Sequence, residues 1–237
     1  MEKAPRQGTI LEAELFSLSF ETAIADVEHL LELHDVENRR KHGHSNPYLE
    51  VLKRAGIILT VTTWETFIED ALEEAVRARL DRAQDPKEMI GTFNAVATDW
   101  LNNKGNVKPP NLLRWTQDGW KSVIGEQFHR EIARLNSPHS RHIMEITKRY
   151  LSHDLTQAWH WQRCPQTLAC KRLDNLIKRR GALVHRSRDI LEVGTAVNRD
   201  YLVSSIDLLK HLVERTEKAL GFKRREVLLP DTGHAET

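Results

Sequence analysis

Residues 57–75 read IILTVTTWETFIEDALEEA, and this stretch decides the fold. Its apolar side chains recur at steps of three and four residues: Ile57, Val61, Trp64, Ile68, Leu72 and Ala75. A continuous stripe at this spacing is typical of an α-helix that packs one face on a core. The pattern predicts a helix from about Pro47 to Arg82, the longest element of the chain. Glu65 and Glu69 fall on a neighbouring face, which we expect to be solvated because carboxylates are rarely buried.

The same period predicts further helices on both sides of this stretch. They cover about residues 9–40, 86–101, 121–135, 139–150, 166–184 and 196–220. Pro86 suits the first turn of its helix, and Gly221 suits the end of the last one. No segment competes as a strand, so the predicted fold class is all-α, a helical bundle built on long antiparallel helices.

Two segments lack the helical period. Residues 102–117 contain glycine, asparagines and two adjacent prolines, which predict a loop, and we expect Trp115 and Trp120 to dock it onto the body. Residues 152–165 are predicted to form a loop with one helical turn. The polar tail at 223–237 is expected to be loose.

The composition is that of a globular protein, with 40 % hydrophobic and 29 % charged residues among 237. We expect one domain over residues 1–237. The 35 Lys and Arg residues nearly balance the 34 Asp and Glu residues, so a phosphate partner must be met by a local patch of charge. No apolar run approaches the roughly 18 residues of a membrane span, and two cysteines are too few for a disulfide framework. These features predict a cytoplasmic protein without a membrane partner.

The local patch is the sequence KRRGALVHRSR, residues 178–188, in which six of eleven side chains are basic. Arg180 shares an apolar helical stripe with three other residues: Leu173, Ile177 and Val184. Arg179 falls off this stripe, and we expect it to face solvent. A permanent charge on such a stripe needs an anionic partner, a subunit boundary or a groove. Arginine and a histidine that titrates near neutral pH are the minimum set for moving protons at a phosphodiester without a metal.

The two side chains of that set do not meet in a regular helix, because His185 lies about 140° around the axis from Arg180. Their cooperation requires either a break at Gly181 or two copies of the segment that face each other across a shared cleft. Gly181 lies on the histidine's face and leaves room there for a substrate. Lys178 and Arg188 lie roughly on the same face, where they could bind flanking phosphates.

Spacing alone also fits simpler interpretations. Cations near the end of a helix interact favourably with its dipole, so the patch could be a basic helix end.

Neither the pair His139 and His142 nor the pair His42 and His44 has a third ligand at a usual spacing, so zinc is not expected. Trp159 to Trp161 could stack on bases, but a core or lid role is favoured. We expect two other side chains to be packed thiols: Cys164 and Cys170.

The segment Leu176–Arg186, near the end of the penultimate long helix, resembles the Arg-x4-His signature of the HEPN superfamily. Trp64–Glu69 is similar to a segment of bacterial HEPN groups linked to defence and toxin systems, of the RiboL-PSP-HEPN type. The resemblance covers core helices at about 10–84 and 166–220 and leaves residues 102–165 as an insertion. It implies a homodimer that forms through the region 178–188.

The resemblance also implies a metal-independent, cofactor-free endoribonuclease. Arg180 would grip the scissile phosphate, and His185 would act as general base or acid while the ribose 2′-hydroxyl attacks to give a 2′,3′-cyclic phosphate. Four neighbours would bind the RNA: Lys178, Arg179, Arg186 and Arg188. An antitoxin or another defence protein is a further possible partner. Active members usually carry Asn, Asp or His after the arginine, where this chain has Gly181, so a catalytically inactive dimerisation or RNA-binding module is the alternative. A purely structural helical protein is a third possibility.

Overall fold

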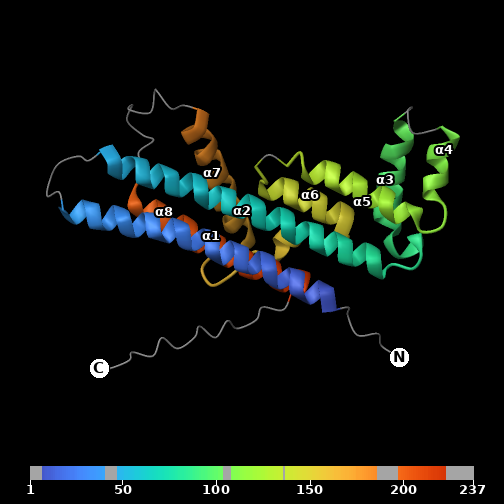
Figure 1. The fold of residues 1–237 in the computed structure, drawn as a ribbon, viewed down its shortest axis with the longest axis horizontal. Helices are drawn as coiled ribbons and strands as arrows, with labels where there is room; N and C mark the ends of the chain where they lie inside the picture. Colours follow the sequence, from blue (N-terminus) through green and yellow to red (C-terminus); the bar gives the residue numbers. More distant parts are fainter. Residues whose placement is uncertain (1–6, 41–46, 104–107, 136, 186–196, 223–237) are drawn as a thin grey trace.

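The computed structural model describes residues 7–40, 47–103, 108–135, 137–185 and 197–222. Every regular element in these ranges is helical, which confirms the all-α prediction (Figure 1). The α-helices are α1 (Gln7–Arg40), α2 (Pro47–Arg82), α3 (Ile90–Asn102), α4 (Pro109–Leu112), α5 (Gly119–Ile132), α6 (Ser140–Leu151), α7 (Gln166–His185) and α8 (Arg199–Leu220). The 3-10 turns are η1 (Pro86–Met89), η2 (Leu113–Trp115) and η3 (Leu155–Ala158). None of the described helices is long and apolar enough to cross a membrane.

Helix α2 is the centre of the arrangement, because it contacts α1, α5, α6, α7 and α8. Figure 1 shows α1 and α2 as two long antiparallel helices that lie side by side, with α5 and α6 along the C-terminal half of α2 and with α3 and α4 near its end. The predicted stripe of α2 is buried: Ile57, Val61, Trp64 and Ile68 are 0 % exposed. The core therefore follows the stretch of sequence from which the fold was predicted.

Trp159 joins this core from the segment before α7. Its ring packs edge-on against Trp64 with centroids 5.7 Å apart, and its Nε1 donates to Oγ1 of Thr216 on α8 at 3.0 Å. The predicted core role of Trp159 is thus confirmed. Trp161 is partly buried and stacks on His211 of α8. These tryptophans fix the segment 152–165 against α2 and α8, and η3 is its predicted helical turn.

The last helix is tied to the first by a forked ion pair. Arg199 donates from Nε and Nη2 to the two carboxylate oxygens of Asp35, each at 2.7 Å. The hydrogen bonds from Arg199 lower the pKa of Asp35 to about 2. Helix α8 begins three residues later than predicted because the side chain of Asn198 caps its first turn. Gly221 ends it with φ 75°, as predicted.

The middle segment differs in part from its prediction. Trp115 packs edge-on against Phe93 and Trp100, and Trp120 is buried beside Phe93, so the docking role of the two tryptophans is confirmed. The prediction of a loop throughout 102–117 is wrong for α4 and η2. Pro109 opens α4, where the N–H that proline lacks would have no helical partner anyway. The tail at 223–237 lies outside the described residues.

Helices α2 and α8 cross closely at Gly56, where a Cβ atom would lie 2.6 Å from Cδ2 of the buried Leu202. In contrast, a Cβ at Gly91 of α3 would meet nothing within 4 Å. Both glycines lie in helices, so alanine brings the same gain in helix propensity at each. We expect Gly56→Ala to be less stable than Gly91→Ala by about 1–3 kcal/mol, the usual cost of overpacking. Urea unfolding of both variants measures this difference, and equal stabilities would contradict the close crossing.

Candidate functional site

Arg180 points from α7 onto α2, where its Nη2 donates to Oε2 of Glu65 at 2.5 Å. The two side chains are only 24 % and 15 % exposed. The anionic partner predicted for Arg180 therefore exists. The prediction that Glu65 belongs to a solvated face is wrong, because α7 crosses α2 over that face.

The periodicity of α2 could not identify this contact, since it does not say which helix covers which face. A different signal was present in the sequence: the segments 64–69 and 176–186 resemble parts of the same family, and the Arg180 to Glu65 pair is where they touch. Glu65 is thus a candidate site residue that the sequence analysis missed.

The pair leaves hydrogen-bonding capacity unused on both sides. A guanidinium has five N–H donors, and among the described residues Arg180 uses one of them, to Glu65. The second carboxylate oxygen of Glu65, Oε1, is buried and has no hydrogen-bond partner in the described part of the chain. The contact is monodentate, so other edges of the guanidinium remain available to an anion.

Further acids follow Glu65 along α2. Burial raises the pKa of Glu69, and the neighbouring charges of Glu65 and Asp70 raise it further. Burial, followed by the charge of Glu73, likewise raises the pKa of Asp70. Arg180 therefore neutralises the first carboxylate of an acidic series, which would otherwise repel a phosphate.

Helix α7 runs without a break from Gln166 to His185, so the predicted alternative of a break at Gly181 is not observed. A Cβ at Gly181 would meet nothing within 4 Å, in agreement with the predicted open space there. His185 is the last described residue of α7, and its side chain lies outside the described part. In a continuous helix the Cα atoms of residues 180 and 185 lie about 140° apart around the axis.

The apolar stripe of α7 ends before the helix does. Leu173 and Ile177 are buried as predicted, but Val184 is 46 % exposed and Leu183 is buried in its place. In Figure 1 the C-terminal end of α7 rises away from α2. An uncovered apolar side chain thus lies one turn from Arg180.

The basic residues around Arg180 have different environments. Lys178 is exposed. Arg179 is half-buried and its guanidinium lies 4.2 Å from the ring centre of Tyr201 on α8, which differs from the solvent-facing position expected for it. Arg186 and Arg188 lie outside the described residues.

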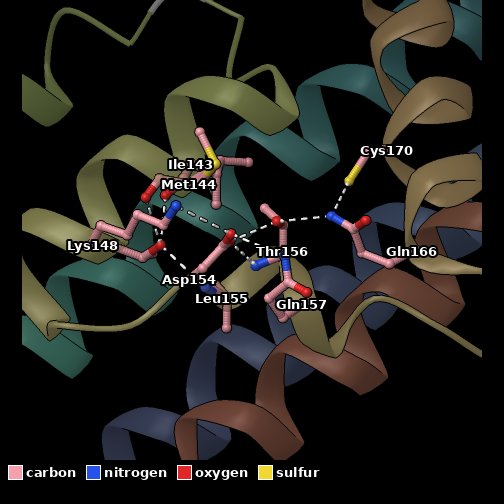
Figure 2. Close-up of polar contacts among 10 residues, drawn as sticks. Ile143, Met144, Lys148, Asp154, Leu155, Thr156, Gln157, Gln166 and Cys170 are labelled. Carbon is pink, nitrogen blue, oxygen red and sulfur yellow. Dashed lines mark hydrogen bonds and ion pairs between the residues drawn. The ribbon is translucent and has the colours of Figure 1, made fainter.

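A polar network holds the N-terminal half of α7 to η3 and α6 (Figure 2). Asp154 caps η3 by accepting from the backbone N of Thr156 at 3.0 Å and from its Oγ1 at 2.6 Å. Gln166 of α7 donates to Thr156 Oγ1 at 3.3 Å and to Sγ of Cys170 at 3.5 Å. Lys148 of α6 approaches Asp154 to 3.7 Å. The network ties the first turns of α7 to η3, and through Lys148 to α6.

The other motifs have structural environments. The rings of His139 and His142 lie edge to face, and His139 Nδ1 lies 3.6 Å from Asp174, a residue that also accepts from the N and Oγ of Ser140. Among the described residues, no three His, Cys, Asp or Glu side chains gather as metal ligands. Cys164 is buried, as expected of a packed thiol, and burial raises the pKa of the half-buried Cys170. His42 and His44 lie outside the described residues.

Comparison with known protein families gives one match. A family model described as RiboL-PSP-HEPN matches residues 21–221, from within α1 to the cap of α8. The match confirms the resemblance predicted from residues 64–69 and 176–186, and it also spans the middle segment 102–165, which that resemblance left out. Neither a curated protein nor a solved structure matches the chain significantly.

Proposed function

Since the chain belongs to the RiboL-PSP-HEPN family, we propose that it is a metal-independent endoribonuclease, a toxin or antiphage defence effector that cleaves RNA to a 2′,3′-cyclic phosphate. The observation that supports this proposal is the position of Arg180. It is a cation that is mostly withdrawn from solvent, held by one acid and with N–H donors to spare. Such a group is suited to stabilise charge that develops on a phosphate.

The proposed reaction is a transesterification. His185 removes the proton of the ribose 2′-hydroxyl, and the 2′-oxygen bonds to phosphorus while the bond from phosphorus to the 5′-oxygen breaks. Arg180 binds the non-bridging oxygens, whose negative charge increases in the transition state. The departing 5′-oxygen takes up a proton from a second acid or from water. Lys178 binds a flanking phosphate.

We infer that the site is shared between two copies of the chain. In a continuous α7 the Arg180 and His185 of one copy diverge. A two-fold arrangement of two α7 ends would bring Arg180 of one copy to His185 of the other. The exposed Val184, one turn from Arg180, suits burial at such a boundary.

The alternative proposal is an inactive RNA-binding or dimerisation module, which is favoured by Gly181 in the place of the usual polar residue. Purified protein incubated with RNA distinguishes the two. The enzyme is expected to release fragments with cyclic phosphate ends at rates unaffected by EDTA. RNA that is bound but stays intact between pH 5 and 9 would favour the inactive module.

A further inference from the structure

We propose that Glu65 is a positioning residue of the ribonuclease site, one that acts on the reaction through Arg180. The proposal rests on the function proposed above. It assigns a role to an acid on α2, far in sequence from the basic segment of α7, and it makes the crossing of these two helices part of the site.

The first argument is the rigidity of the support. Glu65 lies between Trp64, which is 0 % exposed, and Phe67 and Ile68, which are 2 % and 0 % exposed. Trp64 is wedged against Phe67 and Trp159, with ring centroids 6.0 and 5.7 Å apart. The backbone that carries Glu65 is therefore fixed by the core, and a side chain on such a backbone can hold its partner in one place.

The second argument is the need of Arg180 for this contact. Arginine loses several rotatable degrees of freedom when it is ordered, so an unsupported guanidinium would sample many positions. The hydrogen bond to Oε2 of Glu65 is short and charge-assisted. Among the described residues, Glu65 is the hydrogen-bond partner of this guanidinium. Misplacement of a reacting group by about 1 Å can reduce a rate by about 10²-fold.

The third argument is the geometry of the contact. If Glu65 formed a forked, two-point pair with Arg180, it would occupy the edge of the guanidinium that best fits a phosphate. The observed contact instead uses Nη2 and one carboxylate oxygen, while Oε1 stays buried without a described partner. Glu65 therefore holds Arg180 in place and still leaves donors for the scissile phosphate.

Kinetics of two Glu65 variants test this role. Glu65→Ala is expected to lower kcat for RNA cleavage by about 10–100-fold with little change in KM, because the guanidinium is no longer held in the productive position. Glu65→Gln keeps an oxygen that accepts from Nη2 and is expected to retain most of the activity. The matched control is Glu145→Gln, because Glu145 also pairs with an arginine, Arg141, but lies exposed on α6; this variant should cleave like the unchanged protein.

A double-variant cycle separates positioning from a general effect on the fold. If Glu65 acts through Arg180, Glu65→Ala should cause a much smaller loss of kcat in an Arg180→Lys background, which keeps the positive charge beside Glu65, than in the unchanged protein. Independent losses that multiply would overturn the proposal. So would a Glu65→Ala variant that cleaves as fast as the unchanged protein, or faster, since faster cleavage would mean that Glu65 sequesters Arg180.

A measurement that does not depend on RNA cleavage tests the positioning role of Glu65 separately from the proposed ribonuclease function. Nitrogen NMR of the arginine side chains should show the Arg180 guanidinium as rotationally hindered in the unchanged protein and in Glu65→Gln, and as freely rotating in Glu65→Ala. Unchanged Arg180 signals in Glu65→Ala would overturn the positioning role whether or not the protein cleaves RNA. If the unchanged protein does not cleave RNA but the NMR result is as expected, the proposed ribonuclease function is rejected, while the positioning of Arg180 by Glu65 is retained.

Discussion

Replacement of His185 with alanine is expected to lower the rate of RNA cleavage by about 10²–10⁴-fold, the usual contribution of a general acid or base. The physical reason is that the ribose 2′-hydroxyl is a weak nucleophile until a base takes its proton. The fold should not change, because His185 belongs to α7 and alanine favours a helix. Rates of release of cyclic-phosphate fragments from a labelled RNA measure the effect.

The matched control for this variant is His142→Ala, which removes an exposed histidine from α6. It should cleave RNA at the rate of the unchanged protein. Equal rates for His185→Ala and the unchanged protein would remove His185 from the mechanism. A loss in both variants would show that the assay responds to something other than the proposed site.

Much of the fold was predictable because its central helix has a strong pattern. The predicted bounds of α2, Pro47 and Arg82, are those observed, since the stripe is continuous and clear helix breakers flank it. The predictions were weaker where short-range chemistry decides the structure. Pro109 and Pro110 indicated a loop, yet the four-residue helix α4 begins with them, because a first turn does not need their missing N–H groups.

The candidate site was predictable in kind but not in detail. A charge on the packed face of α7 had to find an anionic partner, a boundary or a groove, and this followed from the period of one helix. The identity of that partner depends on how α7 crosses α2, which is set by contacts distant in sequence. The hydrogen bond from Arg180 to Glu65 joins residues 115 positions apart, and no periodic pattern reveals it.

The same reasoning explains why Arg179 and Val184 differ from their predicted environments. Arg179 was placed in solvent because it falls off the apolar stripe, but Tyr201 of α8 lies beside it and offers its ring. Val184 falls on the stripe, but it is 46 % exposed, while Leu183 beside it is buried. A helical wheel gives the direction of a side chain, and only the neighbouring elements decide whether that direction is covered.

The pairing of Arg180 with Glu65 also decides which substitutions are informative. Removal of Arg180 leaves the mostly buried carboxylate of Glu65 uncompensated, which destabilises a protein. Loss of activity in Arg180→Ala alone could therefore reflect a damaged fold. Lysine keeps the positive charge beside Glu65 and removes the planar fork, so it separates the chemistry of the guanidinium from its charge.

Substitution of Arg180 with lysine is expected to reduce kcat by about 10²–10³-fold, the usual cost of losing a donor to developing charge. Circular dichroism and thermal unfolding should show a folded protein. Arg141→Lys is the matched control, because Arg141 also pairs with a glutamate, Glu145, but lies exposed on α6. If Arg180→Lys cleaved RNA like Arg141→Lys, the guanidinium would have no special role.

The same variant tests whether two copies share the site. Mixing Arg180→Lys with His185→Ala yields dimers in which one copy keeps Arg180 and the other keeps His185. After equal mixing, half of the dimers contain one copy of each variant. If the site joins residues of different copies, each mixed dimer holds one intact site of two, so activity should return to roughly a quarter of that of the unchanged protein. If Arg180 and His185 of one copy work together, every mixed site lacks one of them and activity stays low. We expect the recovery, because in a continuous α7 the Cα atoms of residues 180 and 185 lie about 140° apart around the helix axis.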